Sequence, residues 1–108
     1  MIYKEISEED YRKLQDTSGA YLVISSNGSK SWYLHGKRHR EDGPAIEWAN
    51  GDKYWYFNGL RHREDGPAIE WLDGTKEWYL HGIWYGTKKE WEIALEELWA
   101  KEIKDLIV

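Results

Sequence analysis

Apolar and polar residues alternate along the middle of the chain, and the alternation recurs every 23 residues, at 30–34, 53–57 and 76–80. Period-two alternation is typical of half-buried β-strands, and a fixed period in the twenties indicates units that are covered by their neighbours. The string RHREDGPAIEW stands unchanged at Arg38–Trp48 and Arg61–Trp71. The pattern predicts a mainly β protein, a single-layer antiparallel meander of stacked 23-residue hairpins.

Two sets of turn signals separate the predicted strands. They are Asn27-Gly28, Asn50-Gly51 and Asp73-Gly74, and between them His35-Gly36, Asn58-Gly59 and His81-Gly82. Asn-Gly and Asp-Gly favour two-residue type I′ hairpins because both central residues must accept a positive φ. The Glu-Asp-Gly-Pro segments at 41–44 and 64–67 predict a bend or bulge, since proline cannot donate to a ladder.

A two-residue loop at Asn50-Gly51 fixes a register for the hairpins, with Ile46 opposite Trp55. Alternation along the strands then separates indole from phenol rings. One predicted face carries Val23, Trp32, Leu34, Ile46, Trp48, Trp55, Phe57, Ile69, Trp71, Trp78 and Leu80. The other carries Tyr33, Tyr54, Tyr56 and Tyr79 with Glu47, Glu70 and Glu77.

Helical patterns flank the strands at both ends. Ser7 with Asp10 predicts a cap for a short helix over Glu8–Gln15. Thr87 with Glu90 forms a capping box ahead of an amphipathic helix that caps the last repeat or lies on the Trp face. We therefore expect one structural domain with an N-terminal helical cap (1–19), a repeat sheet (20–86) and a C-terminal helix (87–108).

Composition narrows the class of function. A net charge of −5 disfavours direct binding to nucleic acid, and the chain has no cysteine for a disulfide or thiolate metal site. No apolar run approaches the roughly 20 residues of a membrane span, and the first residues do not open a signal peptide. We expect a cytoplasmic protein without a membrane contact.

Residues that could do chemistry favour structural roles. His39 and His62 are equivalent positions spread along the sheet, so they do not converge on a metal. The two Glu-Asp-Gly-Pro segments are identical copies in identical environments, so their carboxylates should titrate alike. This argues against separate acid and base roles. No nucleophile elbow and no phosphate-binding loop is present. We predict no catalytic residue, no metal site, no cofactor and no enzyme activity.

The tyrosine stripe is the strongest candidate for binding a partner. Tyrosine and arginine are enriched at binding hot spots, because they offer a large contact area at a low entropic cost. The predicted contact residues are Tyr33, Tyr54, Tyr56 and Tyr79 with Arg38, Arg40, Arg61 and Arg63. The alternative is that these tyrosines bind no partner, and either form the solvent-exposed face of the sheet or are covered by the N-terminal helix.

The unit WYxxGxxHREDGPAIEWxxG resembles MORN repeats, and is closer to the HRxDGPA-type variants of small phage and bacterial proteins. The resemblance covers residues 20–86 and implies a sheet of stacked hairpins that serves as an interaction or membrane-proximal scaffold. The chain departs from the MORN pattern at Arg63–Gly66, where that family carries Gly-x-Gly. This departure and the acidic balance disfavour lipid binding.

Three hypotheses for the function follow. The first, which takes its phage origin from the resemblance, is a non-enzymatic protein-binding module that inhibits a host factor, such as a nuclease of a defence system. The second is a structural or assembly protein that forms a homodimer through its sheet edge or its C-terminal helix. The third is a protein that sequesters a small anion or nucleotide between arginine and tyrosine side chains of neighbouring protomers.

Overall fold

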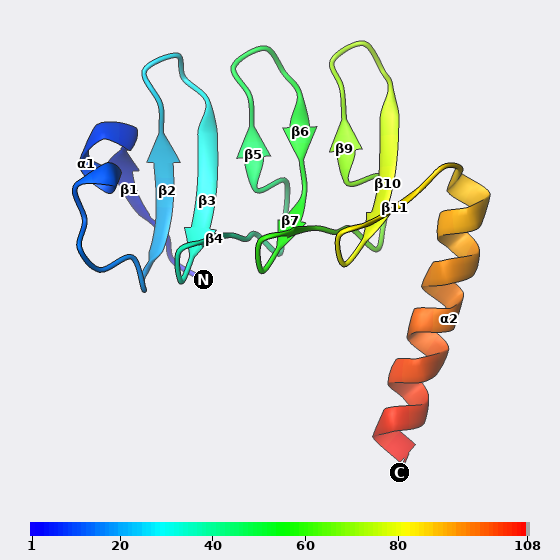
Figure 1. Cartoon of the computed structure of the whole chain (residues 1–108). Coiled ribbons are helices and arrows are strands. Elements are labelled where there is room, and N and C mark those ends of the chain that lie inside the picture. Colours follow the sequence, from blue (N-terminus) through cyan, green and yellow to red (C-terminus); the bar gives the residue numbers. More distant parts are fainter. Residues whose placement is uncertain (108) are drawn as a thin grey trace.

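The structure, a computed structural model, describes residues 1–107 (Figure 1). In chain order its elements are β1 (Lys4–Ser7), α1 (Glu8–Arg12), β2 (Ala20–Ile24), β3 (Lys30–Leu34), β4 (Lys37–Arg38), β5 (Ile46–Glu47), β6 (Lys53–Tyr54), β7 (Tyr56–Phe57), β8 (Leu60–Arg61), β9 (Ile69–Glu70), β10 (Lys76–Leu80), β11 (Ile83–Tyr85) and α2 (Lys88–Ile107). The prediction of a mainly β chain with a C-terminal helix is confirmed.

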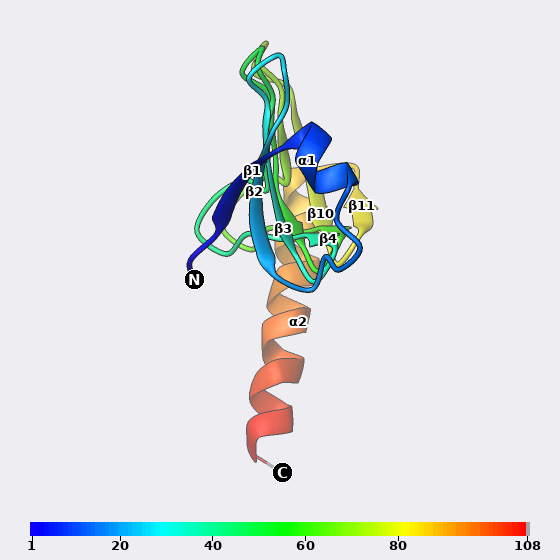
Figure 2. The ribbon, with the colours of Figure 1, turned by 90° about the vertical axis from the view of Figure 1, so that its left-hand side faces the viewer.

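The strands form one thin layer with two tiers. The upper tier is a continuous sheet in the order β1-β2-β3-β5-β6-β9-β10, and the lower tier consists of the small hairpins β3-β4, β7-β8 and β10-β11 (Figure 1). Seen edge-on in Figure 2, the sheet is thin and α1 lies on one of its faces. The expectation of a purely antiparallel sheet is wrong, because β1 pairs with β2 in parallel.

The two sets of turns are where the sequence predicts them, but the loops at Asn27-Gly28, Asn50-Gly51 and Asp73-Gly74 are not the predicted two-residue loops. In the upper hairpins Trp48 N–H donates to the Asp52 carbonyl, so the loop holds three residues, and of these only Gly51 has a positive φ, of 103°. The Asn50 side chain accepts from the Asp52 N–H at 3.0 Å, an Asx turn that favours this longer loop. The two-residue turns lie in the lower tier, where His35 and Gly36 have φ of 52° and 76°.

The extra loop residue shifts the register by one and overturns the predicted separation of ring types. Ile46 lies opposite Tyr54, and Tyr54 lies opposite Ile69. A shift of one residue moves a whole strand to the other face. Trp48 and Trp71 therefore lie on the tyrosine face, each with its ring 5.6 Å from that of Tyr54 in edge-on contact.

Both copies of the repeated string make matching backbone hydrogen bonds. Gly59 N–H donates to the carbonyl of Arg38 at 2.8 Å, and Gly82 N–H donates to that of Arg61 at the same distance. Small and branched side chains fill the centre of the layer at equivalent positions. Ala45 and Ala68 are fully buried, and Ile46 and Ile69 are 1% exposed.

The ends of the chain are helical, with one addition. Ser7 caps α1 by accepting from Asp10 N–H, as predicted, but α1 ends at Arg12 rather than at Gln15 because its last turn tightens into i→i−3 bonds. The segment 1–19, expected to be a helical cap, also contains strand β1. Thr87 caps α2 as predicted, and Val108, the last residue of the predicted helix, lies outside the described residues.

The first half of α2 closes the end of the sheet. Trp91 and Leu95 are each 5% exposed and pack on Leu80 of β10. The Trp78 and Trp91 rings lie 4.8 Å apart. The second half of α2 continues past the lower edge of the sheet (Figure 1).

Candidate functional site

The structure divides the eight predicted contact residues between the two faces of the sheet. The four tyrosines share one face with Arg38 and Arg61. Arg40 and Arg63 lie on the opposite face, each guanidinium carbon 3.9 Å from a ring centre, that of Trp32 or Trp55. The eight residues therefore do not form one contact surface.

Within the tyrosine face, Arg61 is already occupied by its neighbours. Its guanidinium donates to the hydroxyl of Tyr56 at 3.3 Å and to that of Tyr79 at 3.2 Å, and Glu77 accepts from Tyr79 at 3.0 Å. The hydrogen bond to Tyr56, more than any other contact, raises the pKa of Arg61. Burial raises the pKa of Tyr79, which is only 9% exposed. This part of the face stabilises the fold and leaves little surface free.

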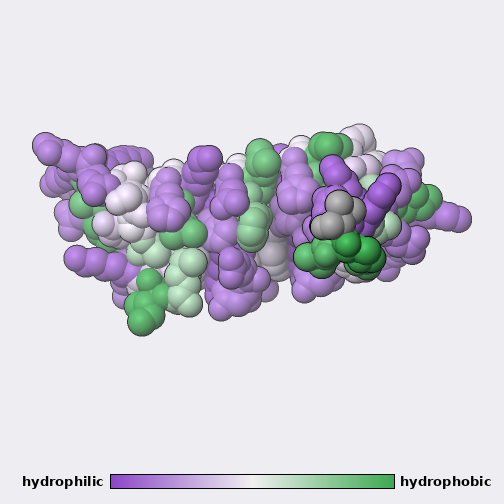
Figure 3. Space-filling view, turned by 90° about the horizontal axis from the view of Figure 1, so that it is seen from below, coloured by the Kyte–Doolittle hydropathy of each residue, from purple (hydrophilic) through white to green (hydrophobic). Residues whose placement is uncertain are grey.

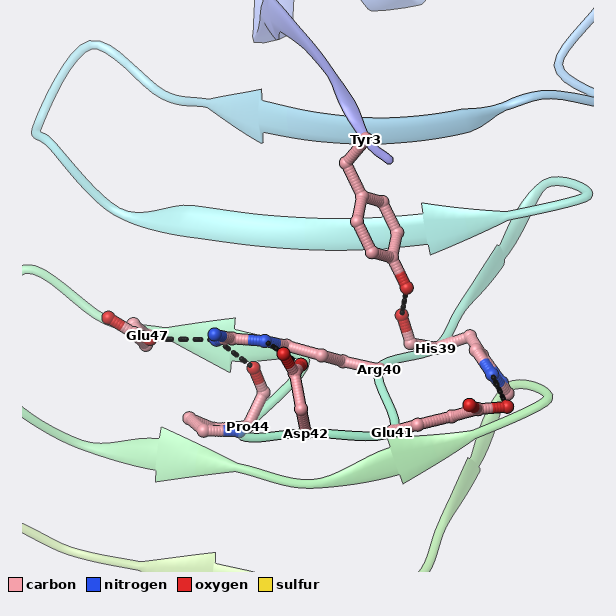
Figure 4. Close-up of polar contacts among 7 residues, drawn as sticks. All are labelled: Tyr3, His39, Arg40, Glu41, Asp42, Pro44 and Glu47. Atoms are coloured by element: carbon pink, nitrogen blue, oxygen red, sulfur yellow. Dashed lines mark hydrogen bonds and ion pairs between the residues drawn. The ribbon is translucent and has the colours of Figure 1, made fainter. Parts of the chain in front are cut away.

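Arg40 and Arg63 hold the Glu-Asp-Gly-Pro bends in place. Arg40 donates to Asp42 at 3.0 Å, to the carbonyl of Pro44 at 3.1 Å and to Glu47 at 3.0 Å (Figure 4). Arg63 makes the equivalent three bonds in the second copy. A Cβ atom on Gly43 would lie 2.9 Å from the Arg40 guanidinium carbon, so the bend needs glycine there for close approach. The repeated arginine, aspartate and glycine are structural residues.

The two repeated histidines join each copy to the next. His39 Nδ1 accepts from Asn58 N–H at 3.0 Å, and His62 Nδ1 accepts from His81 N–H at 2.8 Å. In the neutral ring the proton then lies on Nε2, which faces Glu41 at 3.5 Å in the first copy and Glu64 at 2.9 Å in the second. In Figure 4 the Tyr3 hydroxyl donates to the His39 carbonyl at 3.2 Å, which ties the N-terminus to the first copy.

Glu64 has a further donor, from α2. Its carboxylate accepts from the Trp99 indole at 2.7 Å as well as from His62. Burial alone raises the pKa of Glu64, but these hydrogen bonds outweigh it and hold the pKa below its ordinary value. No sequence motif predicts this contact, because the two residues are 35 positions apart.

Two further features are open to a ligand: a hollow that the sequence did not predict, and part of the C-terminal helix, which the sequence offered only as a dimer contact. One is a hollow of about 440 Å³ between α1 and the first hairpin, lined by residues that include Tyr11, Ser31 and Arg38. The other is the distal half of α2, where Ile103 and Leu106 are 58% and 85% exposed. The repeat pattern gave no signal for the hollow, because the hollow arises where the copies differ and Ser31 stands in place of Tyr54.

Comparison with known proteins gives no family for this chain: no family model, no curated protein and no solved structure matches it. Across residues 1–107, neither helix combines the length and the apolar character needed to cross a bilayer.

Proposed function

We propose that this chain is a non-enzymatic protein-binding module, and that the distal half of α2 is its main contact element. The observation that carries the proposal is the apolar surface of this half-helix. Ile103, Leu106 and Ile107 are 58%, 85% and 80% exposed, although Trp91 and Leu95 of the same helix are buried against the sheet. Figure 3 shows hydrophobic side chains gathered at the end of α2 on a largely hydrophilic underside. A helix with such a face fits a hydrophobic groove of a partner.

The charge of α2 indicates what surrounds that groove. The helix carries four lysines against six carboxylates, and its net charge of −2 lies in the first half, next to the neutral contact half, in a chain of net −5. An acidic helix favours a partner whose groove has a basic rim, because complementary potentials steer association. A second copy of this acidic chain offers no such rim. We therefore favour a different, basic protein, and the hypothesis of an inhibitor that docks on a host factor stays our proposal for its role.

The repeated hairpins then serve as the scaffold. We propose a MORN-like organisation, in which equivalent hairpins stack and α2 closes one end. The matching bonds of Arg40 and Arg63, and of His39 and His62, support it. A rigid sheet holds the first half of α2 in a fixed orientation, which lowers the entropic cost of presenting the second half to a partner.

The test begins with a partner isolated from host lysate and continues with that partner purified. Ile103→Gln combined with Leu106→Gln should raise the dissociation constant by about thirtyfold, since burial of two such side chains contributes about 2 kcal/mol or more to binding. Leu72→Gln, a change of an equally exposed residue in a distant loop (69% exposed), is the matched control and should bind normally.

Other results point to the other hypotheses. If the α2 variant binds the partner normally and Tyr56→Ala loses binding, the contact lies on the tyrosine face and the proposed role of α2 is wrong. Sedimentation could show a fraction of dimer that rises with protein concentration and is lost in the α2 variant. That result would favour the self-associating assembly protein. Loss of binding in Leu72→Gln as well would show a general effect on the chain rather than a contact of α2.

A further inference from the structure

The hollow between α1 and the first hairpin exists because the first copy lacks a large side chain. Ser31, Tyr54 and Glu77 are equivalent positions, 23 residues apart, on the same face of the sheet. Tyr54 fills its place with a ring, and Glu77 bonds to Tyr79. Ser31 fills almost nothing, and the space beside it, about 440 Å³, falls within the roughly 300–1,000 Å³ of small-molecule sites.

An arginine without a hydrogen-bond acceptor lines this space, its guanidinium carbon 5.9 Å and 5.7 Å from the ring centres of Tyr33 and Tyr56. Arg38 lines the hollow, and among residues 1–107 no hydrogen bond or ion pair reaches its guanidinium, whose Nε is buried and unsatisfied. Its equivalent in the next copy, Arg61, donates to two tyrosine hydroxyls. A buried donor without an acceptor destabilises the fold, and more so when it is charged. The terminal nitrogens of the same guanidinium are not buried, and an anionic group in the hollow would accept hydrogen bonds from them.

Aromatic rings form the walls of the same space. Tyr11 of α1 stacks on Tyr33 with ring centres 4.9 Å apart and planes 28° from parallel. Trp48 lines another side and is 39% exposed. Such surfaces bind planar rings by stacking, as aromatic side chains do with nucleic-acid bases. The hydroxyl of Ser31 adds a free polar group.

The remaining charges do not oppose an anion. Glu8 also lines the hollow, but its carboxylate is paired with Arg12, the second arginine of the lining. The pair is close to neutral and leaves Arg38 as the net charge of the site.

We propose that this hollow binds a small molecule that joins a planar ring to an anionic group, of the class of the nucleoside monophosphates. Arg38 binds the anion, and Trp48 or the Tyr11–Tyr33 pair stacks on the ring. The site lies within one chain and needs no second protomer. It is also independent of the proposed contact of α2, which lies at the other end of the sheet.

Calorimetric titration of the full chain with four probes of one type, AMP, GMP, CMP and UMP, tests the site, with adenosine and inorganic phosphate as partial ligands. At least one monophosphate should bind, and quench tryptophan fluorescence through Trp48. Adenosine and phosphate should each bind at least about tenfold more weakly, since each lacks one of the two contacts. If no monophosphate binds, or if phosphate alone binds as tightly, the proposal is wrong.

Two variants locate the site, and one controls for it. Ser31→Tyr copies the second repeat and closes the hollow, and Arg38→Gln removes the charge; each should weaken binding at least about tenfold. Arg61→Gln, the same change at an occupied arginine, should stay within about twofold. Circular dichroism checks that each variant is folded. If Ser31→Tyr is unfolded, Arg38→Gln alone decides the question. Equal losses in Arg38→Gln and Arg61→Gln, or unchanged binding in a folded Ser31→Tyr, would overturn the assignment.

Discussion

The two copies of the eleven-residue string share the same bend but differ where they meet residues outside it. Inside the string, Arg40 and Arg63 make the same three bonds. Toward residues outside it, Arg38 has no acceptor among residues 1–107, while Arg61 donates to two tyrosine hydroxyls. The donors of the same arginine are therefore occupied in one copy and available to a ligand in the other.

This difference shows how a repeat protein separates folding from binding. Most repeated residues, such as Arg40 and Arg63, fold the chain and have their hydrogen bonds satisfied within it, whereas Arg38 does not. The residues that vary between copies, such as Ser31 against Tyr54, decide where a cavity or a free charge remains. A search for function in such a chain should begin at the positions where the repeat fails.

The comparison predicts, first, that the cores of the two copies contribute equally. Ile46→Ala and Ile69→Ala each remove a side chain that is 1% exposed, and each should lower the free energy of unfolding by about 2–5 kcal/mol. Urea denaturation followed by tryptophan fluorescence measures both. A difference above about 2 kcal/mol between them would mean that one copy packs differently, and would break the equivalence.

A smaller effect should distinguish the two histidine–glutamate pairs. Glu64→Ala removes an acceptor for both His62 and Trp99 and should cost about 1 kcal/mol, a value kept low because the carboxylate is partly exposed. Glu41→Ala, the matched control, removes a contact of 3.5 Å and should cost less. Equal losses would show that the bond from α2 adds no stability.

The Glu64 effect should also depend on pH. The pKa of Glu64 is lowered in the folded state, so its contribution is fully present above its ordinary value of 4.5. It is lost as the pH falls below 4.5 and through the folded-state value. Unfolding of the wild type and of Glu64→Ala should therefore converge in acid. A gap that stays constant down to pH 3 would contradict the assigned hydrogen bonds.

The sequence predicts the local features well and the long-range ones poorly. Turn positions, the Ser7 and Thr87 caps and the mainly β class follow from patterns within a few residues. The register failed because the Asn50 side chain accepts a backbone hydrogen bond and so selects a longer loop than Asn-Gly usually forms. That loop moved Trp48 to the other face, and the equivalent loop, where Asp73 accepts from Thr75 N–H, moved Trp71.

The candidate site was predicted only in part for a related reason. Hot-spot statistics identify tyrosine and arginine but not which of their polar groups are already satisfied. Only the fold shows that Arg40 and Arg63 clamp their own bends, and that Tyr11 reaches Tyr33 from α1. The parallel strand β1 has no alternating apolar face, because only Ile6 is partly buried. No pattern in the sequence therefore predicted a strand there.

The smallest expected effect belongs to the distal half of α2, in contrast to the half that packs on the sheet. Ile103→Gln with Leu106→Gln should change the free energy of unfolding by less than about 0.5 kcal/mol, because both side chains are mostly exposed and glutamine is as good a helix former. Thermal and urea unfolding measure this directly. A near-zero change would let any loss of partner binding be read as a lost contact. A loss above about 1 kcal/mol would mean that these side chains already pack within the chain, and the apolar face would no longer be free for a partner.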